Sequence, residues 1–352
     1  MARQIKTPVE YLENLRKKKM PLLTSKDLAA EDIATWQRKL RRKLCSLLDV
    51  SLKPDTGIKG RLVASEAKKS HWRQKWDITT SQGITIPIYL LVPRDATLPR
   101  PVIIALHGHG NGKTDVVGLT PAGREYKKRP PYIEIFNQDY TASLVDAGYI
   151  VAVPDALGFG ERQGKTFPLP AGEKGVDYCR LAAMPLLVFG KPILGLRTDD
   201  TIRVVDFLST HPLVDREKIG MIGLSLGGQM TLFTAALDIR IKMAIVSGYL
   251  CDFEGMLIDT AHCVCNHVPN LLKYAEASDI AGLIAPRAVL YESGTMDMAF
   301  PIKDVKATYK KARQIYKTLG RTERIRHLVF EGPHRYNGDL TPQWCRKWLK
   351  IS

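Results

Sequence analysis

Short apolar runs alternate with longer amphipathic stretches over most of the chain. Runs with the nearly continuous apolar character of strands covered on both faces occur at residues 102–106, 149–153, 219–222, 241–246, 289–292 and 326–330. Helices are favoured between them, at residues 139–147, 199–209, 228–237 and 302–319. This alternation predicts an α/β fold, with a mostly parallel central sheet and helices on both faces.

The regions that flank this pattern extend the prediction. Residues 71–80 and 84–92 are separated by Ser81-Gln82-Gly83 and predict antiparallel strands at the edge of the sheet. Residues 1–60 predict a helical N-terminal extension packed on the core, because apolar positions near residues 33–47 recur at helical spacing. Residues 61–352 form the main domain. Its insertions at about 157–197 and 248–282 each follow a predicted strand and are expected to roof a site.

The sequence Gly223-Leu224-Ser225-Leu226-Gly227-Gly228 joins a predicted strand to a predicted helix. A serine between close glycines at such a turn predicts a nucleophile elbow, in which the strained turn exposes the serine hydroxyl. Ser225 is therefore the candidate nucleophile, and the N-terminal end of the following helix points at the same place.

An acid and a histidine follow Ser225 in the chain order that this kind of site requires. Asp297 comes after the strand at residues 289–292, and His334 comes after the strand at residues 326–330. Glu292 competes with Asp297 but lies inside the strand. An imidazole can accept the serine proton at neutral pH and return it to the leaving group, while a carboxylate orients the imidazole.

A glycine-rich loop supplies the last part of the candidate site. The strand at residues 102–106 leads into His107-Gly108-His109-Gly110, where a backbone N–H would help to bind a developing oxyanion. We expect the amides of Leu226 and His109 to form this oxyanion hole, with Gly108 or Gly110 as alternatives to His109. A metal ion at the two histidines is not expected, since no further ligand lies at a matching spacing.

The order of these motifs resembles the acetyl xylan esterase and dienelactone hydrolase-like branch of the α/β-hydrolases. The residues that carry the resemblance are His107 to Gly110, Pro154 to Arg162, Gly223 to Gly228, Glu292 to Asp297, and Glu331 to Arg335. Cys263 to Pro269 and Ile284 to Arg287 resemble a bacterial subgroup of that branch. The resemblance implies an α/β-hydrolase fold for residues 61–352 and a serine carboxylesterase that hydrolyses small acyl esters, acetyl above all, including esters on carbohydrate. Dienelactone hydrolases proper use a cysteine nucleophile, so Ser225 favours the esterase side.

Other activities stay open at this stage. A serine peptidase or amidase and a lactone hydrolase use the same fold, and a binding protein without catalysis is a further alternative. Phe159, Glu161 and Arg162 are the candidate substrate-binding residues, although Glu161 and Arg162 could instead form a local ion pair. Further candidates for lining a pocket are Phe159, Phe167, Tyr178, Phe189 and Leu250, for which filling of the core is an equal alternative.

Composition narrows the class of protein. The chain has 352 residues, a formal net charge of +16 and six cysteines. No apolar run reaches the ~18 residues of a membrane span, and the first twenty residues lack the apolar segment of a secretory signal, so a cytoplasmic protein is expected. Residues 1–80 carry 19 Lys and Arg against 9 Asp and Glu, but without a recognisable module no nucleic-acid partner is expected, and the oligomeric state is left open.

The cysteines do not suggest a disulfide framework. Cys45 and Cys179 are expected to be reduced thiols in the core. Cys263 and Cys265 could form a metal cluster with His262 and His267, but the spacing is not that of common zinc modules and packing is favoured. We therefore expect neither a metal nor another cofactor.

Overall fold

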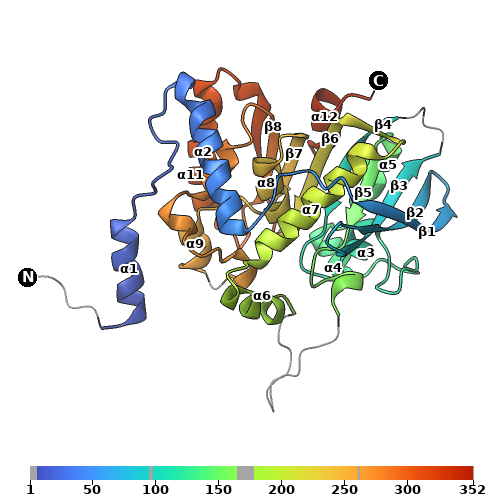
Figure 1. Cartoon of the computed structure of the whole chain (residues 1–352), viewed down its shortest axis with the longest axis horizontal. Helices are drawn as coiled ribbons and strands as arrows, with labels where there is room; N and C mark the ends of the chain where they lie inside the picture. The colour runs from blue at the N-terminus through green and yellow to red at the C-terminus, as the bar shows by residue number, and fades with distance from the viewer. Residues whose placement is uncertain (1–5, 95–96, 98, 165–177, 261, 352) are drawn as a thin grey trace, which may run out of the picture.

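The computed structural model describes residues 6–94, 97, 99–164, 178–260 and 262–351. These residues form a nine-stranded sheet with the order β1-β2-β3-β5-β4-β6-β7-β8-β9 (Figure 1). The strands are β1 (Lys59–Ala67), β2 (His71–Thr79), β3 (Thr85–Pro93), β4 (Arg100–Leu106), β5 (Ile150–Pro154), β6 (Val214–Leu224), β7 (Ile241–Ser247), β8 (Ala288–Gly294) and β9 (Ile325–Phe330). From β5 to β9 all neighbours pair in parallel, while β1, β2 and β3 pair antiparallel with one another and β3 pairs antiparallel with β5.

Helices connect the strands. The α-helices are α1 (Pro8–Lys18), α2 (Ala30–Leu48), α3 (Lys113–Val117), α4 (Pro131–Phe136), α5 (Thr141–Asp146), α6 (Tyr178–Val188), α7 (Ile193–Thr210), α8 (Leu226–Leu237), α9 (Phe253–Leu257), α10 (Ala277–Gly282), α11 (Ile302–Thr318) and α12 (Thr341–Trp348). Short 3₁₀ turns occur at η1 (Gly160–Arg162), η2 (Val264–Asn266), η3 (Leu271–Lys273) and η4 (Thr322–Arg324).

Two apolar cores cover the two faces of the sheet. One core contains the buried side chains of α2, α7, α8, α10 and α11. The other contains those of α5 and α12 together with Val116 of α3. The central strands β4 and β5 have only buried residues after Arg100, because side chains on both faces point into one of these cores.

The predicted α/β fold with helices on both faces is confirmed. The predicted parallel strands and the two predicted antiparallel strands are all present, with ends shifted by a few residues. The strand β1 was not predicted, because every residue in it is exposed and no apolar alternation marks it. The insertion predicted to end at residue 197 ends earlier, since α7 begins at Ile193.

The N-terminal helices differ in how they contact the rest of the molecule. The helix α2 buries Ile33, Trp36, Leu40 and Leu44 against the core, as its spacing predicts, although Leu48 rather than Leu47 completes the buried stripe. The helix α1 has no buried residue and lies at the periphery of the molecule in Figure 1, where Arg16 pairs with Glu254 and Asp259. The division into an extension and a main domain at residue 60 stays a prediction.

Within the described residues, no single helix is long and apolar enough to cross a membrane. Only when taken together do the helical segments Cys179–Val188 and Ile193–Thr210 have the length and apolar composition of a membrane span, and a bend of 102° separates them.

The parallel strands place their carboxyl ends along one edge of the sheet. Ser225 follows β6, His107 follows β4, Asp297 lies three residues after β8, and His334 lies four residues after β9. Parallel strands necessarily bring such residues together at one edge, which is where ligands bind in open α/β sheets.

A close backbone contact between α2 and α7 provides a test of this packing. A Cβ atom on Gly195 would lie 1.8 Å from the carbonyl oxygen of Leu48. Because a backbone oxygen cannot move aside cheaply, we expect Gly195→Ala to lower the free energy of unfolding by about 1–3 kcal/mol. Urea denaturation measures this change. The exposed helical substitution Gln314→Ala is the control and should stay within about 0.5 kcal/mol of wild type. Equal stabilities for the two variants would contradict the contact.

Candidate active site

Ser225 occupies a strained turn between β6 and α8. Its φ of 59° and ψ of −117° lie where residues other than glycine are rare. The turn is tight because a Cβ on Gly223 would lie 2.2 Å from the backbone carbon of Gly227, and a Cβ on Gly227 would lie 2.0 Å from the carbonyl oxygen of Leu106. The two glycines thus allow α8 to start directly against β6 and β4, which is the geometry of a nucleophile elbow.

Asp297 and His334 form a hydrogen-bonded pair. The Nδ1 atom of His334 lies 2.7 Å from Oδ2 of Asp297. The other oxygen, Oδ1, accepts the backbone N–H groups of Ala299 at 2.9 Å and Phe300 at 3.1 Å. The ring of Phe300 stacks on the imidazole with centroids 5.6 Å apart. The carboxylate of Asp297 and the ring of His334 are therefore both fixed. The hydrogen bond to Asp297 uses Nδ1 and leaves Nε2 of His334 available to a substrate or to the serine.

Ser225 and His334 contact the same dipeptide at the end of β7. The backbone N–H of Ser225 donates to the carbonyl of Ser247 at 3.0 Å. A Cβ on the next residue, Gly248, would lie 2.8 Å from Cε1 of His334. No hydrogen bond joins the Ser225 and His334 side chains among the described contacts. Such bonds are often long in a substrate-free site and tighten when substrate binds.

Glu292 is separated from this pair. It is fully buried in β8, and its Oε1 accepts the backbone N–H of Gly338 at 3.1 Å. Burial raises the pKa of Glu292 from 4.5 to about 7. Among the described hydrogen bonds none links it to His334, so Asp297 is the carboxylate that orients the imidazole.

The predicted oxyanion donors lie beside Ser225. Leu226 is the first residue of α8, so its N–H is among those that have no acceptor within the helix. The loop after β4 approaches from the other side, since a Cβ on Gly108 would lie 3.6 Å from that of Ser225. Within the described backbone no acceptor is found for the N–H of His109. The roles of Leu226 and His109 stay predictions.

His107 has a structural place in the same loop. Its Nε2 accepts the N–H of Ala156 at 3.0 Å, which assigns the ring proton to Nδ1, and Nδ1 donates to the carbonyl of Gly108 at 2.7 Å. Burial lowers the pKa of His107, so the ring is neutral and connects the loop after β4 to the loop after β5.

A buried ion pair connects the same two loops. Asp155 accepts the backbone N–H of Lys113 at 2.7 Å and also pairs with its ammonium group, and both side chains are at most 1% exposed. The ammonium of Lys113 pairs as well with Glu161, whose second oxygen binds Lys75. Removing one partner would leave a buried charge uncompensated, which strongly disfavours movement of these loops.

The predicted substrate-binding residues have partners of their own. Glu161 and Arg162 do not pair with each other among the described contacts, since Arg162 binds Asp200 at 2.6 Å. Phe159 is 6% exposed and packs edge-on against His109 with centroids 5.6 Å apart. Substrate contact by these three residues stays a prediction, but the predicted local ion pair is wrong because each charge meets a residue from a distant segment.

The other pocket candidates separate into three cases. Phe167 and the side chain of Tyr178 lie outside the described residues. Phe189 is 78% exposed and faces solvent, whereas Leu250 is 1% exposed and belongs to the core. Phe189 is thus a surface side chain and Leu250 fills the core, so within the described part of the chain neither lines a pocket.

The cysteines are also arranged differently from the prediction. All six are thiols. Cys179 does not lie in apolar surroundings, because Arg197 approaches its sulfur at 3.4 Å. Cys263 and Cys265 lie near Cys179 and His109 instead of forming a group with His262 and His267. The Nδ1 of His262 contacts the side chain of Asn266 at 3.1 Å.

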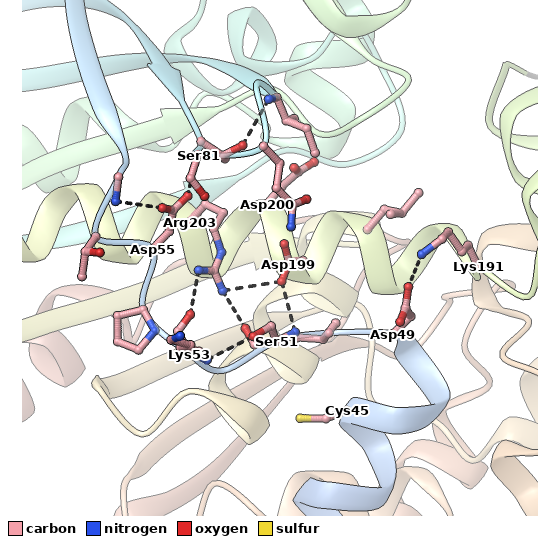
Figure 2. A pocket seen from close by; sticks show the side chains of 18 of the residues that line it. Cys45, Asp49, Ser51, Lys53, Asp55, Ser81, Lys191, Asp199, Asp200 and Arg203 are labelled. Atoms are coloured by element: carbon pink, nitrogen blue, oxygen red, sulfur yellow. Dashed lines mark hydrogen bonds and ion pairs between the residues drawn. The ribbon is translucent and has the colours of Figure 1, made fainter.

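A separate pocket of about 890 Å³ lies between the end of α2, the turn after β2 and α7 (Figure 2). Arg203 crosses it and donates to the carbonyls of Ser51 and Lys53 and to Asp206. Both terminal nitrogens of this guanidinium are thus committed to the fold, whereas its Nε has no hydrogen-bond partner among the described residues. The pocket contains neither Ser225 nor His334, so we place the chemistry at the carboxyl edge of the sheet.

The fold and the elbow define the class of protein as an α/β-hydrolase. The family model described as "Abhydrolase family" matches residues 6–318, and the chain belongs to that family. The match includes Ser225 and Asp297 and ends before His334. The resemblance inferred from the sequence motifs is confirmed at this level.

Individual proteins agree with this assignment. The chain is 30% identical over 274 residues to "Putative hydrolase YtaP" of Bacillus subtilis (strain 168), covering 75% of this chain and 83% of that protein. The structure resembles that of a "putative acetyl xylan esterase" from Bacteroides fragilis NCTC 9343, with a TM-score of 0.77, 16% identity, and coverage of 100% of this chain and 92% of the other. It also resembles a glucuronoyl esterase from Solibacter usitatus, with a TM-score of 0.63, 16% identity, and coverage of 94% and 99%.

The raised pKa of Glu292 leads to a pH-dependent stability. The pKa of Glu292 is 4.5 in the unfolded chain and about 7 in the folded protein. Its contribution to the free energy of unfolding is therefore fully present below pH 4.5 and is lost as the pH rises through 7. Between pH 4.5 and 7.5, ionisation of Glu292 should lower the free energy of unfolding of wild type by up to about 3 kcal/mol. We expect this fall to be absent in Glu292→Gln, which cannot ionise. Denaturant unfolding at several pH values measures the difference between the two proteins. The exposed control Glu323→Gln should parallel wild type, and a parallel Glu292→Gln curve would contradict the assignment.

Proposed function

We propose that the protein is a serine carboxylesterase that hydrolyses small acyl esters, acetyl esters above all, including esters carried by carbohydrate. The Asp297–His334 hydrogen bond of 2.7 Å carries the proposal, because it is the acid–imidazole pair that would activate Ser225, which is held in a strained elbow. The similar acetyl xylan esterase and glucuronoyl esterase support esters of carbohydrates as the substrate class.

The reaction follows from the positions of these groups. With the Nδ1 proton of His334 donated to Asp297, Nε2 can accept the proton of Ser225 as the hydroxyl attacks the ester carbonyl. The amides of Leu226 and His109 stabilise the oxyanion. The imidazolium then protonates the leaving alkoxide, and the acyl group remains on Ser225. Water, deprotonated by the same imidazole, releases the acid in the second half of the reaction.

Removal of the nucleophile is the primary test. We expect Ser225→Ala to lower the kcat for a short p-nitrophenyl ester by about 10⁴-fold or more, because the attacking atom is lost. The matched control is Ser46→Ala on the exposed face of α2, which should retain wild-type kcat. Equal turnover by wild type and Ser225→Ala would reject the proposal.

A panel of substrates separates the alternatives. Acetylated xylo-oligosaccharides, glucuronoyl methyl esters, lactones and peptide amides should be compared by kcat/KM. Preference for the acetyl esters supports the proposal, whereas preference for amides or lactones would favour a peptidase or a lactone hydrolase. Binding of a carbohydrate without turnover of any member would indicate a non-catalytic protein.

Gly248 offers a second test that leaves the three side chains in place. A Cβ there would press on Cε1 of His334 at 2.8 Å. We expect Gly248→Ala to lower kcat by about 10- to 100-fold with a smaller change in KM, since a displaced base loses its alignment. Gly320→Ala is the matched control, because Gly320 has a similar φ of 65° but nothing within 4 Å of the added Cβ. If both variants lose kcat equally, the contact with His334 is not the cause.

A further inference from the structure

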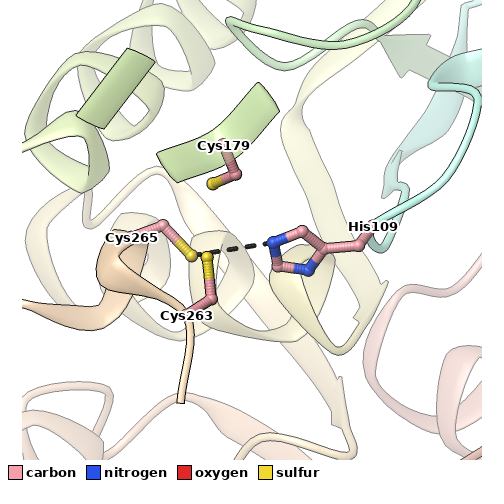
Figure 3. A group of neighbouring side chains, drawn as sticks. All are labelled: His109, Cys179, Cys263 and Cys265. Carbon is pink, nitrogen blue, oxygen red and sulfur yellow. Dashed lines mark hydrogen bonds between the residues drawn. The ribbon is translucent and has the colours of Figure 1, made fainter. Parts of the chain in front are cut away.

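Four potential metal ligands from three separate segments meet at His109, in the loop after β4 (Figure 3). His109 comes from the loop after β4, Cys179 from the start of α6, and Cys263 and Cys265 from the segment around η2. Their ligand atoms all lie within 4.8 Å of one another, and Sγ of Cys265 lies 3.8 Å from Nε2 of His109. Cys45, Cys251 and Cys345 do not belong to this group.

The spacing of these atoms fits a tetrahedral ion. Zinc bonds of about 2.3 Å to sulfur and about 2.0 Å to nitrogen give edges of roughly 3.5 to 3.8 Å between neighbouring ligand atoms. The Cys265–His109 separation of 3.8 Å is within a few tenths of an ångström of the sulfur–nitrogen edge of about 3.5 Å. Three sulfurs and one imidazole nitrogen are a donor set that structural zinc sites use. The sequence suggested Cys263 and Cys265 as possible metal ligands but paired them with His262 and His267, because His109 and Cys179 lie far away along the chain.

The charge of the surroundings fits as well. Arg197 is fully buried, and two of its nitrogens lie 3.4 Å from Sγ of Cys179. No carboxylate lies within ion-pair distance of it among the described residues. Three thiolates around a divalent ion carry one net negative charge, and a buried guanidinium balances it.

Hydrogen-bond donors also point at the sulfurs. Besides Arg197 at Cys179, the side-chain nitrogen of Asn266 lies 3.7 Å from Sγ of Cys265. The oxygen of Asn266 accepts from Gln229 of α8 at 2.7 Å. Donors that orient metal-bound thiolates are typical of the groups that surround structural sites.

We propose that His109, Cys179, Cys263 and Cys265 bind one zinc ion. With four protein ligands the coordination is closed, so the ion supports structure and takes no part in hydrolysis. It joins the loop that carries the proposed oxyanion donor to α6 and to the segment that follows β7. Fixing the side chain of His109 restrains its backbone N–H as well.

Metal content tests this proposal independently of activity. Tag-free protein, purified without chelators under reducing conditions, should contain about one zinc per chain by elemental analysis. Cys265→Ala should contain less than about a tenth of that, since one ligand is removed. Cys345→Ala is the matched control, because Cys265 and Cys345 are both 1% exposed, and it should retain the zinc. Ser225→Ala should also retain it, which separates this test from that of the esterase.

Cobalt provides a readout that does not depend on a variant that folds. Zinc-depleted, reduced wild type should bind one equivalent of Co²⁺ and show the thiolate-to-cobalt charge-transfer band and intense visible bands of tetrahedral coordination. Wild type that binds neither zinc nor cobalt would overturn the proposal. A disulfide among these cysteines, found by mass spectrometry after alkylation without reduction, would overturn it too, as would full zinc content in Cys265→Ala.

Discussion

The arrangement of the active site depends on one steric constraint, the close approach of backbones around Ser225. Gly223 and Gly227 have no room for a side chain, since an added Cβ on either would overlap backbone atoms at 2.2 or 2.0 Å. The turn therefore holds Ser225 at a φ of 59° and starts α8 against the end of β4. The N–H of Ser225 donates to the carbonyl of Ser247 on the neighbouring strand β7, and the next residue, Gly248, packs against the ring of His334. Backbone contacts around Ser247 and Gly248 thus connect the serine to the histidine, whose ring is further fixed by Asp297 and Phe300.

Buried charges hold the loops that follow β4 and β5 in place. The Lys113–Asp155 pair lies where water cannot screen it, and its strength depends on both partners being present. Because Asp155 also accepts the N–H groups of Lys113 and Glu161, one carboxylate fixes the loops after β4 and β5. The loop after β4, which carries the proposed oxyanion donor His109, is therefore held by this pair and by His107.

The sequence was sufficient to predict the features that arise from local pattern. Apolar runs identified the parallel strands, and the chain order Ser225, Asp297, His334 identified a pair that the structure joins by a hydrogen bond. Features that depend on which distant segments meet were not predictable. The strand β1 has no buried face, so pairing rather than burial defines it. Glu161 pairs with Lys113 of α3 and Arg162 with Asp200 of α7, partners that the adjacency of the two residues in the sequence could not indicate.

The charge distribution shows a similar difference between sequence and structure. The basic N-terminal region suggests an attraction for anions, but part of this charge is compensated within the molecule. Arg16 of α1 binds Glu254 and Asp259, and Lys19 binds Glu254 and Glu276, all within the segment that follows β7.

These ion pairs are at most partly buried, and each stabilises only weakly by itself, but they act on a segment that is also held elsewhere. Gln229 of α8 donates to Asn266 at 2.7 Å and to Tyr249 at 3.0 Å, and both bonds are buried. The described residues 248–260 and 262–282 are thus attached to α1 and Lys19 on one side and to α8, the helix that follows Ser225, on the other. The described part of this segment is therefore restrained on two sides, and its first residue, Gly248, lies directly against His334.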